Sequence, residues 1–85
     1  MSDNAVTIPT PHMTVDAAGL KCPLPILRAK KALAQMESGQ ILEVITTDNH
    51  AERDFQAFCA QTGNTLIAQT PSPDQSAVHH YLQRR

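Results

Sequence analysis

The stretch Asp16-Ala-Ala-Gly-Leu-Lys-Cys22-Pro-Leu-Pro25 joins a short apolar run to an amphipathic segment and carries a cysteine at the junction. Proline is tolerated in the first turn of a helix, because its missing N–H would have no intrahelical partner there. Pro23 and Pro25 therefore predict a helix that begins at Pro23. Cys22 would lie at or beside the N-cap of this helix, and Gly19 would permit the preceding turn.

The position of Cys22 predicts an activated thiol. The positive end of the helix dipole, with the free N–H groups of Leu24 and Ile26, would favour the thiolate over the thiol. Helix N-termini can bring cysteine pKa values down to roughly 3.5–7.5, and Lys21 adds a positive charge beside the sulfur. The alternative is a small buried cysteine in a loop, since free cysteines often simply fill space in a core.

Hydrophobic periodicity on both sides of this stretch predicts the other elements. It indicates strands at 12–16, 41–46, 65–70 and 76–83, and helices at 23–37 and 50–62. The order β-α-β-α-β-β predicts an α+β fold, a two-layer α/β sandwich in which two helices cover one face of a four-stranded mixed sheet. The last two strands, joined by the turn-forming segment 71–75, are expected to form an antiparallel hairpin.

The first predicted helix has two distinct faces. One arc is apolar and is expected to face the core: Ile26, Ala29, Ala32, Leu33 and Met36. The opposite arc carries Leu24, Leu27, Arg28 and Lys31, so two leucines stand on a basic surface close to the cysteine. Isolated exposed leucines are common and need no explanation. Beside a reactive group, however, they could instead form a docking patch for a partner protein.

Other positions are assigned to the core or to the surface. The expected core consists of Val15, Ile26, Leu33, Met36, Leu42, Val44, Phe55, Phe58, Leu66 and Leu82. Cys59 shares a helical arc with both phenylalanines and is expected to be inert core filler. His79 and His80 are neighbours on a strand and point to opposite faces, so no metal site is expected there. Arg84 and Arg85 are expected to form a solvated C-terminal end.

Short-range signals suggest where the two helices begin and end. Gly39 is expected to end the first helix as its C′ residue. Asn49 and Glu52 fit a capping box at the start of the second helix. Asp48 is an alternative cap one position earlier.

Length and composition are typical of a small soluble domain. The 85 residues allow one modest core, expected in a domain over residues 12–85 that follows a flexible leader, residues 1–11. A net charge of −1 argues against a general nucleic-acid binder, and no apolar run is long enough to span a membrane. With no signal-peptide pattern and only two cysteines, the protein is expected in the reducing cytoplasm.

The residues near Cys22 argue against two kinds of thiol chemistry. A thiol hydrolase needs a base beside its nucleophile, and the motif contains no histidine. Thioredoxin-type exchange uses Cys-x-x-Cys, whereas the fourth position here is Pro25. What remains is a thiolate that accepts a group and hands it on. If that group is sulfur, the carried form is a persulfide, and neither a cofactor nor a metal is needed.

The motif and its surroundings resemble a known family. Val15-Asp16-x-x-Gly19-Leu-Lys-Cys22-Pro-Leu-Pro25-Ile26 is similar to the signature of the TusA/SirA-like sulfur-carrier family. The likeness continues through residues 29–33, 39–44, 47–48, 53–55 and Phe58 to Tyr81-Leu82-x-Arg84-Arg85, so it covers roughly residues 13–85. The resemblance also implies the two-layer α/β fold.

This resemblance implies a sulfur relay with sulfurtransferase-type persulfide chemistry. Cys22 would take persulfide sulfur from a cysteine desulfurase or a rhodanese-like protein and pass it to an acceptor protein. Destinations in the family include thiolation of the tRNA wobble uridine, molybdenum-cofactor supply and sulfur oxidation. Asp16 and Gly19 match the signature and are implied to shape the loop behind the cysteine. Asn49 stands where many members carry proline, which leaves the choice of partner open.

A second hypothesis is a regulatory or adaptor module without enzymatic activity. Its helix surface around Leu24, Leu27, Arg28 and Lys31 would bind a protein partner, and the thiol would be incidental. A carrier with a short exposed loop is expected to work as a monomer, without direct contact to nucleic acid or membrane.

Overall fold

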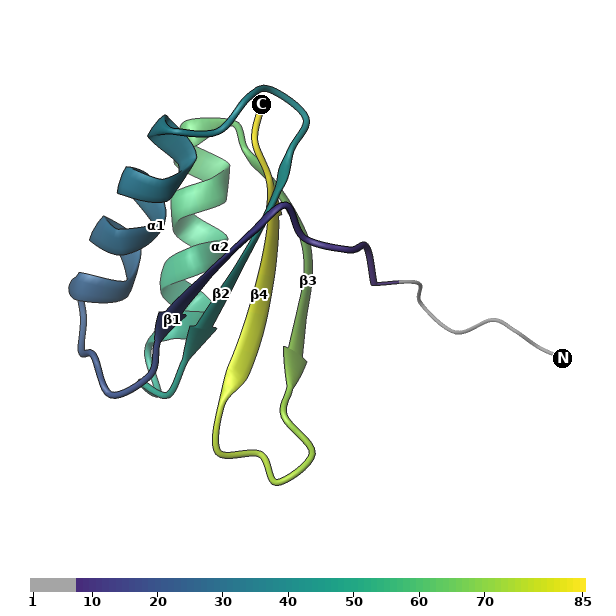
Figure 1. Ribbon diagram of the computed structural model, residues 1–85. Coiled ribbons are helices and arrows are strands. Elements are labelled where there is room, and N and C mark those ends of the chain that lie inside the picture. Colours follow the sequence, from purple (N-terminus) through teal and green to yellow (C-terminus); the bar gives the residue numbers. More distant parts are fainter. Residues whose placement is uncertain (1–7) are drawn as a thin grey trace, which may run out of the picture.

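The computed structural model describes residues 8–85, which form two helices and four strands (Figure 1). The elements are β1 Met13–Ala17, α1 Leu24–Ala34, β2 Ile41–Thr46, α2 Ala51–Thr62, β3 Thr65–Pro71 and β4 Val78–Gln83. The predicted element order is confirmed, and every strand begins and ends within two residues of its expected place. Residues 1–7 of the expected leader lie outside the described residues.

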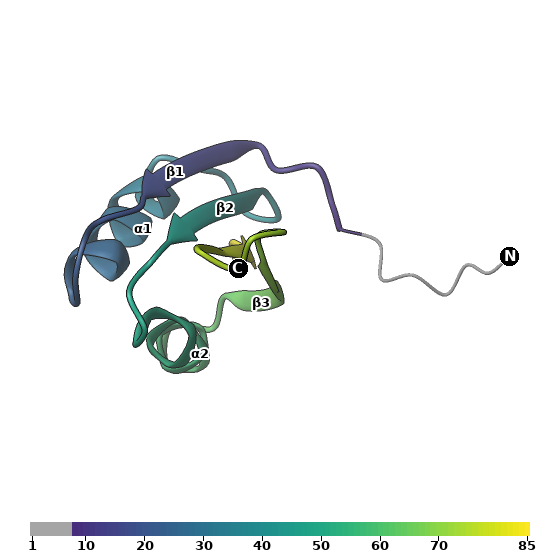
Figure 2. The ribbon, with the colours of Figure 1, turned by 90° about the horizontal axis from the view of Figure 1, so that it is seen from below.

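The four strands form one mixed sheet in the order β1-β2-β4-β3. β1 runs parallel to β2, and α1 is the connection between them, whereas β4 runs antiparallel to both β2 and β3. The view along the sheet in Figure 2 shows that both helices lie on the same side of it. The predicted two-layer sandwich and the C-terminal hairpin are therefore confirmed.

The core lies between the sheet and the two helices. Along β2, Leu42, Val44 and Thr46 are buried beneath the helices, because successive side chains of a strand point to opposite faces. All ten expected core residues contribute. Six are buried (Leu33, Met36, Leu42, Val44, Phe55 and Leu82) and four are partly buried against them (Val15, Ile26, Phe58 and Leu66).

His80 is a polar side chain within this core, and none of its surface is exposed. Its ring stacks on Phe55 of α2 with a centroid separation of 4.5 Å. Its Nε2 lies 2.7 Å from Oγ1 of Thr46, and its Nδ1 lies 3.0 Å from Nε2 of Gln69. Burial lowers the pKa of His80 to about 4, so the ring is neutral at pH 7.

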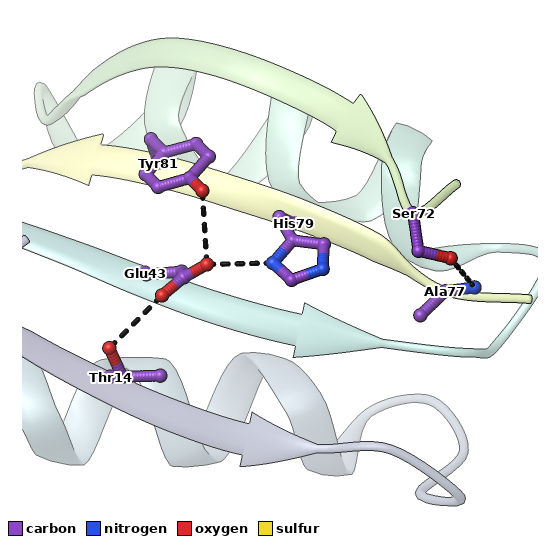
Figure 3. Close-up of polar contacts among 6 residues, drawn as sticks. All are labelled: Thr14, Glu43, Ser72, Ala77, His79 and Tyr81. Atoms are coloured by element: carbon purple, nitrogen blue, oxygen red, sulfur yellow. Dashed lines mark hydrogen bonds and ion pairs between the residues drawn. The ribbon is translucent and has the colours of Figure 1, made fainter. Parts of the chain in front are cut away.

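The opposite face of the sheet carries a polar cluster centred on Glu43 (Figure 3). The Glu43 carboxylate accepts hydrogen bonds from Thr14 Oγ1 at 3.0 Å, Tyr81 Oη at 3.0 Å and His79 Nδ1 at 2.7 Å. Burial alone would raise the pKa of Glu43, but these hydrogen bonds outweigh it and hold the pKa below its ordinary value. His79 and His80 thus point to opposite faces of β4, as their adjacent positions predict.

The end of α1 differs from its expected place. The helix ends at Ala34, well before Gly39, because the next two N–H groups bond to carbonyls three residues earlier and tighten the last turn. The C-terminal segment adds a contact there, since Nε of Arg84 donates to the carbonyl of Leu33 at 2.9 Å. The prediction of a solvated Arg84 is therefore wrong: it is half-buried and satisfies a carbonyl at the end of α1.

The predicted capping box of α2 is also wrong. The helix begins at Ala51 with His50 as its N-cap, and neither Asn49 nor Glu52 donates or accepts a side-chain cap bond. Asp48 bonds to this turn instead. Its Oδ1 accepts from the N–H of His50 at 3.4 Å, and its carbonyl accepts from the N–H of Ala51 at 3.1 Å. The second carboxylate oxygen is therefore available to a neighbouring loop.

Candidate functional site

Cys22 lies in the connection between β1 and α1. Figure 1 shows this connection leaving the carboxyl end of β1 and turning into α1. The Cys22 side chain is exposed. The carbonyl of Pro23 accepts the N–H of Leu27 at 3.1 Å, so Pro23 is the N-cap and α1 begins one residue later than predicted. Cys22 therefore stands beside the N-cap, and the peptide bond that joins it to Pro23 is cis. Pro25 is buried in the first turn.

The connection between β2 and α2 holds the cysteine loop by its backbone. The N–H of Gly19 donates to Thr47 Oγ1 at 2.9 Å, and the N–H of Cys22 donates to Asp48 Oδ2 at 2.9 Å. Gly19 has a φ of +82°, a conformation that side chains disfavour. Because β1 and β2 are parallel, the loops that follow them lie at the same edge of the sheet. The sulfur is thus presented to solvent from a fixed backbone.

Two other residues singled out from the sequence, Asp16 near the end of β1 and Lys21 in the loop, form hydrogen bonds with nearby backbone N–H groups. Oδ1 of Asp16 accepts from the N–H of Ala18 at 3.0 Å and so shapes the turn after β1. The Lys21 side chain is exposed, and its carbonyl accepts the N–H of Leu24 at 2.8 Å in the turn that precedes α1.

The Cys22 sulfur borders a shallow groove between the start of α1 and one side of α2. Pro23 and Ile26 line it from the α1 side, and α2 contributes Asp54, Ala57, Phe58 and Gln61. The groove brings the carboxylate of Asp54, which belongs to the first turn of α2, to the cysteine.

The electrostatic surroundings of Cys22 are the reverse of those predicted. The nearby Asp54 carboxylate, which can accept a hydrogen bond from the thiol but not from the thiolate, raises the pKa of Cys22, and partial desolvation and the charge of Asp48 act in the same direction. The helix start stabilises a thiolate less than predicted, because both prolines of the motif lack an N–H and the N–H of Leu24 is bonded to the carbonyl of Lys21. The predicted lowering of the thiol pKa is therefore wrong.

Comparison with known proteins identifies the family. The family model described as sulfurtransferase TusA matches residues 13–84, which is most of the chain. The chain belongs to the TusA family. It is 51% identical over 71 residues to the sulfur carrier protein TusA of Allochromatium vinosum, which covers 84% of this chain and 90% of that protein. It is also 65% identical over 54 residues to a relative from Neisseria meningitidis, which covers 64% of this chain and 73% of that protein.

A solved structure supports the same conclusion. The crystal structure of a SirA-like protein from Desulfitobacterium hafniense superposes with a TM-score of 0.74 at 28% identity, covering 84% of this chain and 95% of that one. The predicted TusA/SirA-like family and its α+β fold are confirmed.

The predicted docking residues of this TusA-family chain lie on the exposed side of α1. Leu24 and Leu27 are 46% and 52% exposed, and Arg28 and Lys31 are exposed as well. Arg28 and Lys31 also line a groove between α1 and β1. We name these four residues the α1 patch.

Other candidate groups of this TusA-family chain lie apart from the site. Cys59 is 4% exposed in the core, and burial raises its pKa to about 11, so it is a poor nucleophile at neutral pH. Within residues 8–85, no cluster of three or more metal-binding side chains is present. None of the helices in that part of the chain is long and apolar enough to cross a membrane.

Three residues of the TusA-family site lie in stretches that resemble the family, but the sequence assigns them no role at Cys22: Thr47, Asp48 and Asp54. The sequence assigns Asp48 only to the start of α2. A usable signal exists, because polar residues that follow one parallel strand meet the loop that follows its neighbour. Asp54 has no such signal, since its approach to Cys22 depends on how α1 and α2 pack together.

Proposed function

We propose that this TusA-family protein is a sulfur carrier in which Cys22 holds sulfur as a persulfide between a donor protein and an acceptor protein. The main support for this proposal is that the Cys22 thiol is exposed on a loop whose backbone is held by two hydrogen bonds. The other cysteine, Cys59, is buried. The similarity to the sulfur carrier protein TusA of Allochromatium vinosum supports the same role.

Loading of Cys22 requires no oxidant or reductant. The Cys22 sulfur, as a thiolate, attacks the outer sulfur of the donor persulfide. The S–S bond of the donor breaks, and its inner sulfur leaves with the bonding electron pair and takes up the proton that Cys22 gave up. A thiol and a persulfide thus give a persulfide and a thiol. Unloading repeats this exchange when an acceptor thiolate attacks the outer sulfur on Cys22.

The partners we propose follow from the family resemblance. The donor is a cysteine desulfurase or a rhodanese-like protein of the cytoplasm, and the acceptor is a protein of tRNA thiolation, molybdenum-cofactor supply or sulfur oxidation. The carrier acts as a monomer. It needs no contact with nucleic acid of its own, in keeping with a net charge of −1.

The α1 patch is the surface we assign to the donor and acceptor. Leu24 and Leu27 expose apolar area on the helix that begins beside Cys22, and Arg28 and Lys31 place positive charge around it. Both partners must reach the same sulfur, so they use the same patch in turn. A partner surface that fits has an apolar centre and an acidic rim.

Transfer of radiolabelled sulfur tests the function. A cysteine desulfurase, its pyridoxal phosphate and labelled cysteine are incubated with the protein, and the products are separated on a non-reducing gel. We expect label on the wild type and on Cys59→Ser, and none on Cys22→Ser. Reversing the charges of Arg28 and Lys31 is expected to lower labelling while the thiol still reacts with a small alkylating agent. Absence of label with both donor classes would overturn the proposal.

The exposed leucines of the α1 patch also favour a second candidate, an adaptor module that binds a partner through this surface. The two candidates differ in what inactivates the protein in cells. An adaptor keeps its activity in Cys22→Ser and loses it when the charges of Arg28 and Lys31 are reversed. A sulfur carrier loses its activity in Cys22→Ser.

A further inference from the structure

Two carboxylates of the β2–α2 region act on Cys22 in different ways. Asp48 binds its backbone N–H at 2.9 Å and holds the loop in place. Asp54 is half-buried in the first turn of α2 and lines the groove that the sulfur borders. No lysine or arginine among residues 8–85 forms an ion pair with Asp54, so its charge is directed at the groove without an internal counter-charge.

The arrangement of charges around the sulfur favours the neutral thiol. Asp54 faces it from α2, Asp48 from the β2–α2 connection, and Lys21 is the one cation beside it in its own loop. A carboxylate accepts a hydrogen bond from a thiol but repels a thiolate. The thiolate is the form that attacks a sulfur atom, so a nearby carboxylate slows the reactions of the free protein.

We propose that Asp54 is a positioning residue that keeps Cys22 protonated in the free carrier and releases it only when a partner presents a cation to the groove. This inference rests on the proposed function. A lysine or arginine of the docked donor pairs with Asp54, and the thiolate then forms in contact with the donor persulfide. The thiol proton passes to solvent, and the inner sulfur of the donor takes up a proton when it leaves. Away from a partner, the exposed sulfur resists alkylation and oxidation.

The required partner chemistry follows from this arrangement. A productive donor combines a persulfide with at least one basic side chain placed to reach Asp54 and Asp48, beside the acidic rim that suits the α1 patch. The partner surface is thus expected to carry positive charge where it meets the groove beside Cys22 and negative charge where it meets the α1 patch. This alternation would orient the two proteins as well as activate the sulfur.

The test is the pH profile of Cys22 alkylation by iodoacetamide, followed by mass spectrometry of the peptide that contains it. Asp54→Asn is compared with the wild type. Glu52→Gln is the matched control, because it removes the same charge from the same turn without lining the groove. We expect the midpoint of the Asp54→Asn profile at lower pH and a rate at neutral pH that is higher by up to about tenfold, the change in thiolate for about one pKa unit. Glu52→Gln is expected to follow the wild type.

Coincident profiles for Asp54→Asn and the wild type would overturn the inference, as would equal shifts in both variants. Asp54→Ser provides a second variant, and thermal melting establishes that each variant is folded before its profile is read. The outcome is separable from that of the proposed function. A wild-type protein that takes no label from any donor refutes the carrier role, whereas a protein that is labelled normally but shows coincident profiles refutes only the role of Asp54.

Discussion

Lowering the pH from about 7.5 to about 5 is expected to destabilise the fold through a single buried histidine. Gln69 Nε2 donates to the carbonyl of Glu52 at 2.8 Å and lies 3.0 Å from His80 Nδ1. An amide NH2 can only donate, so Nδ1 of His80 is an acceptor and its Nε2–H donates to Thr46 Oγ1 at 2.7 Å. A second proton on Nδ1 would break the contact with Gln69 and place a charge in the core.

The magnitude follows from the two pKa values of His80. Burial, with a smaller contribution from the charge of His79, lowers the pKa from its ordinary 6.5 to about 4 in the folded protein. The unfolded chain therefore binds a proton first as the pH falls, and stability is lost between these two values. At about 1.4 kcal/mol for each pKa unit the full loss is about 3 kcal/mol, of which about 2 kcal/mol is already lost at pH 5.

Urea unfolding at several pH values between about 7.5 and 5 measures this loss, which also lowers the melting temperature by about 10 °C. His80→Gln keeps a neutral polar side chain and is expected to flatten the pH dependence. His79→Gln, on the opposite face of β4, is the matched control and is expected to retain it. If His80→Gln loses stability with the same slope as the wild type, protonation of His80 is not the cause of the loss.

Three further predictions concern the loop and the core. Gly19→Ala is expected to lower the free energy of unfolding by about 1–2 kcal/mol in urea titrations, because its φ of +82° is strained for a side chain although nothing lies within 4 Å of the added methyl. Asp48→Ala removes the acceptor of the Cys22 N–H and is expected to speed amide hydrogen exchange at Cys22 several-fold while β4 amides are unchanged. Cys59→Ser places a hydroxyl in the core and is expected to cost about 1–3 kcal/mol in urea titrations without reducing sulfur loading.

Local pattern was sufficient to predict the architecture from the sequence. The hydrophobic periodicity of the sequence predicted the element order and all ten core residues. The structure shows the same periodicity, since β2 alternates buried and half-buried residues and α1 buries one apolar arc. These features depend on the periods of strands and helices, which are visible in the amino-acid order. The cysteine motif likewise predicted the exposed sulfur beside a helix start.

The properties that could not be predicted depend on long-range contacts. The thiol pKa of Cys22 follows from Asp54, which approaches it only after α1 and α2 have packed against the sheet. The end of α1 depends in part on Arg84, which comes from the other end of the chain. Asp48 accepts hydrogen bonds from the N–H of His50, two residues away, and from the N–H of Cys22 in another loop. A capping pattern in the sequence can indicate only the first of these. Sequence spacing alone does not encode these distances.

A sulfur carrier of this kind must take up one sulfur atom on Cys22. Intact-protein mass spectrometry after incubation with a cysteine desulfurase and cysteine measures this. The prediction is a gain of about 32 Da that a reductant reverses and that fragmentation assigns to the peptide containing Cys22. An unchanged mass with every donor, or a gain that persists in Cys22→Ser, would contradict the account.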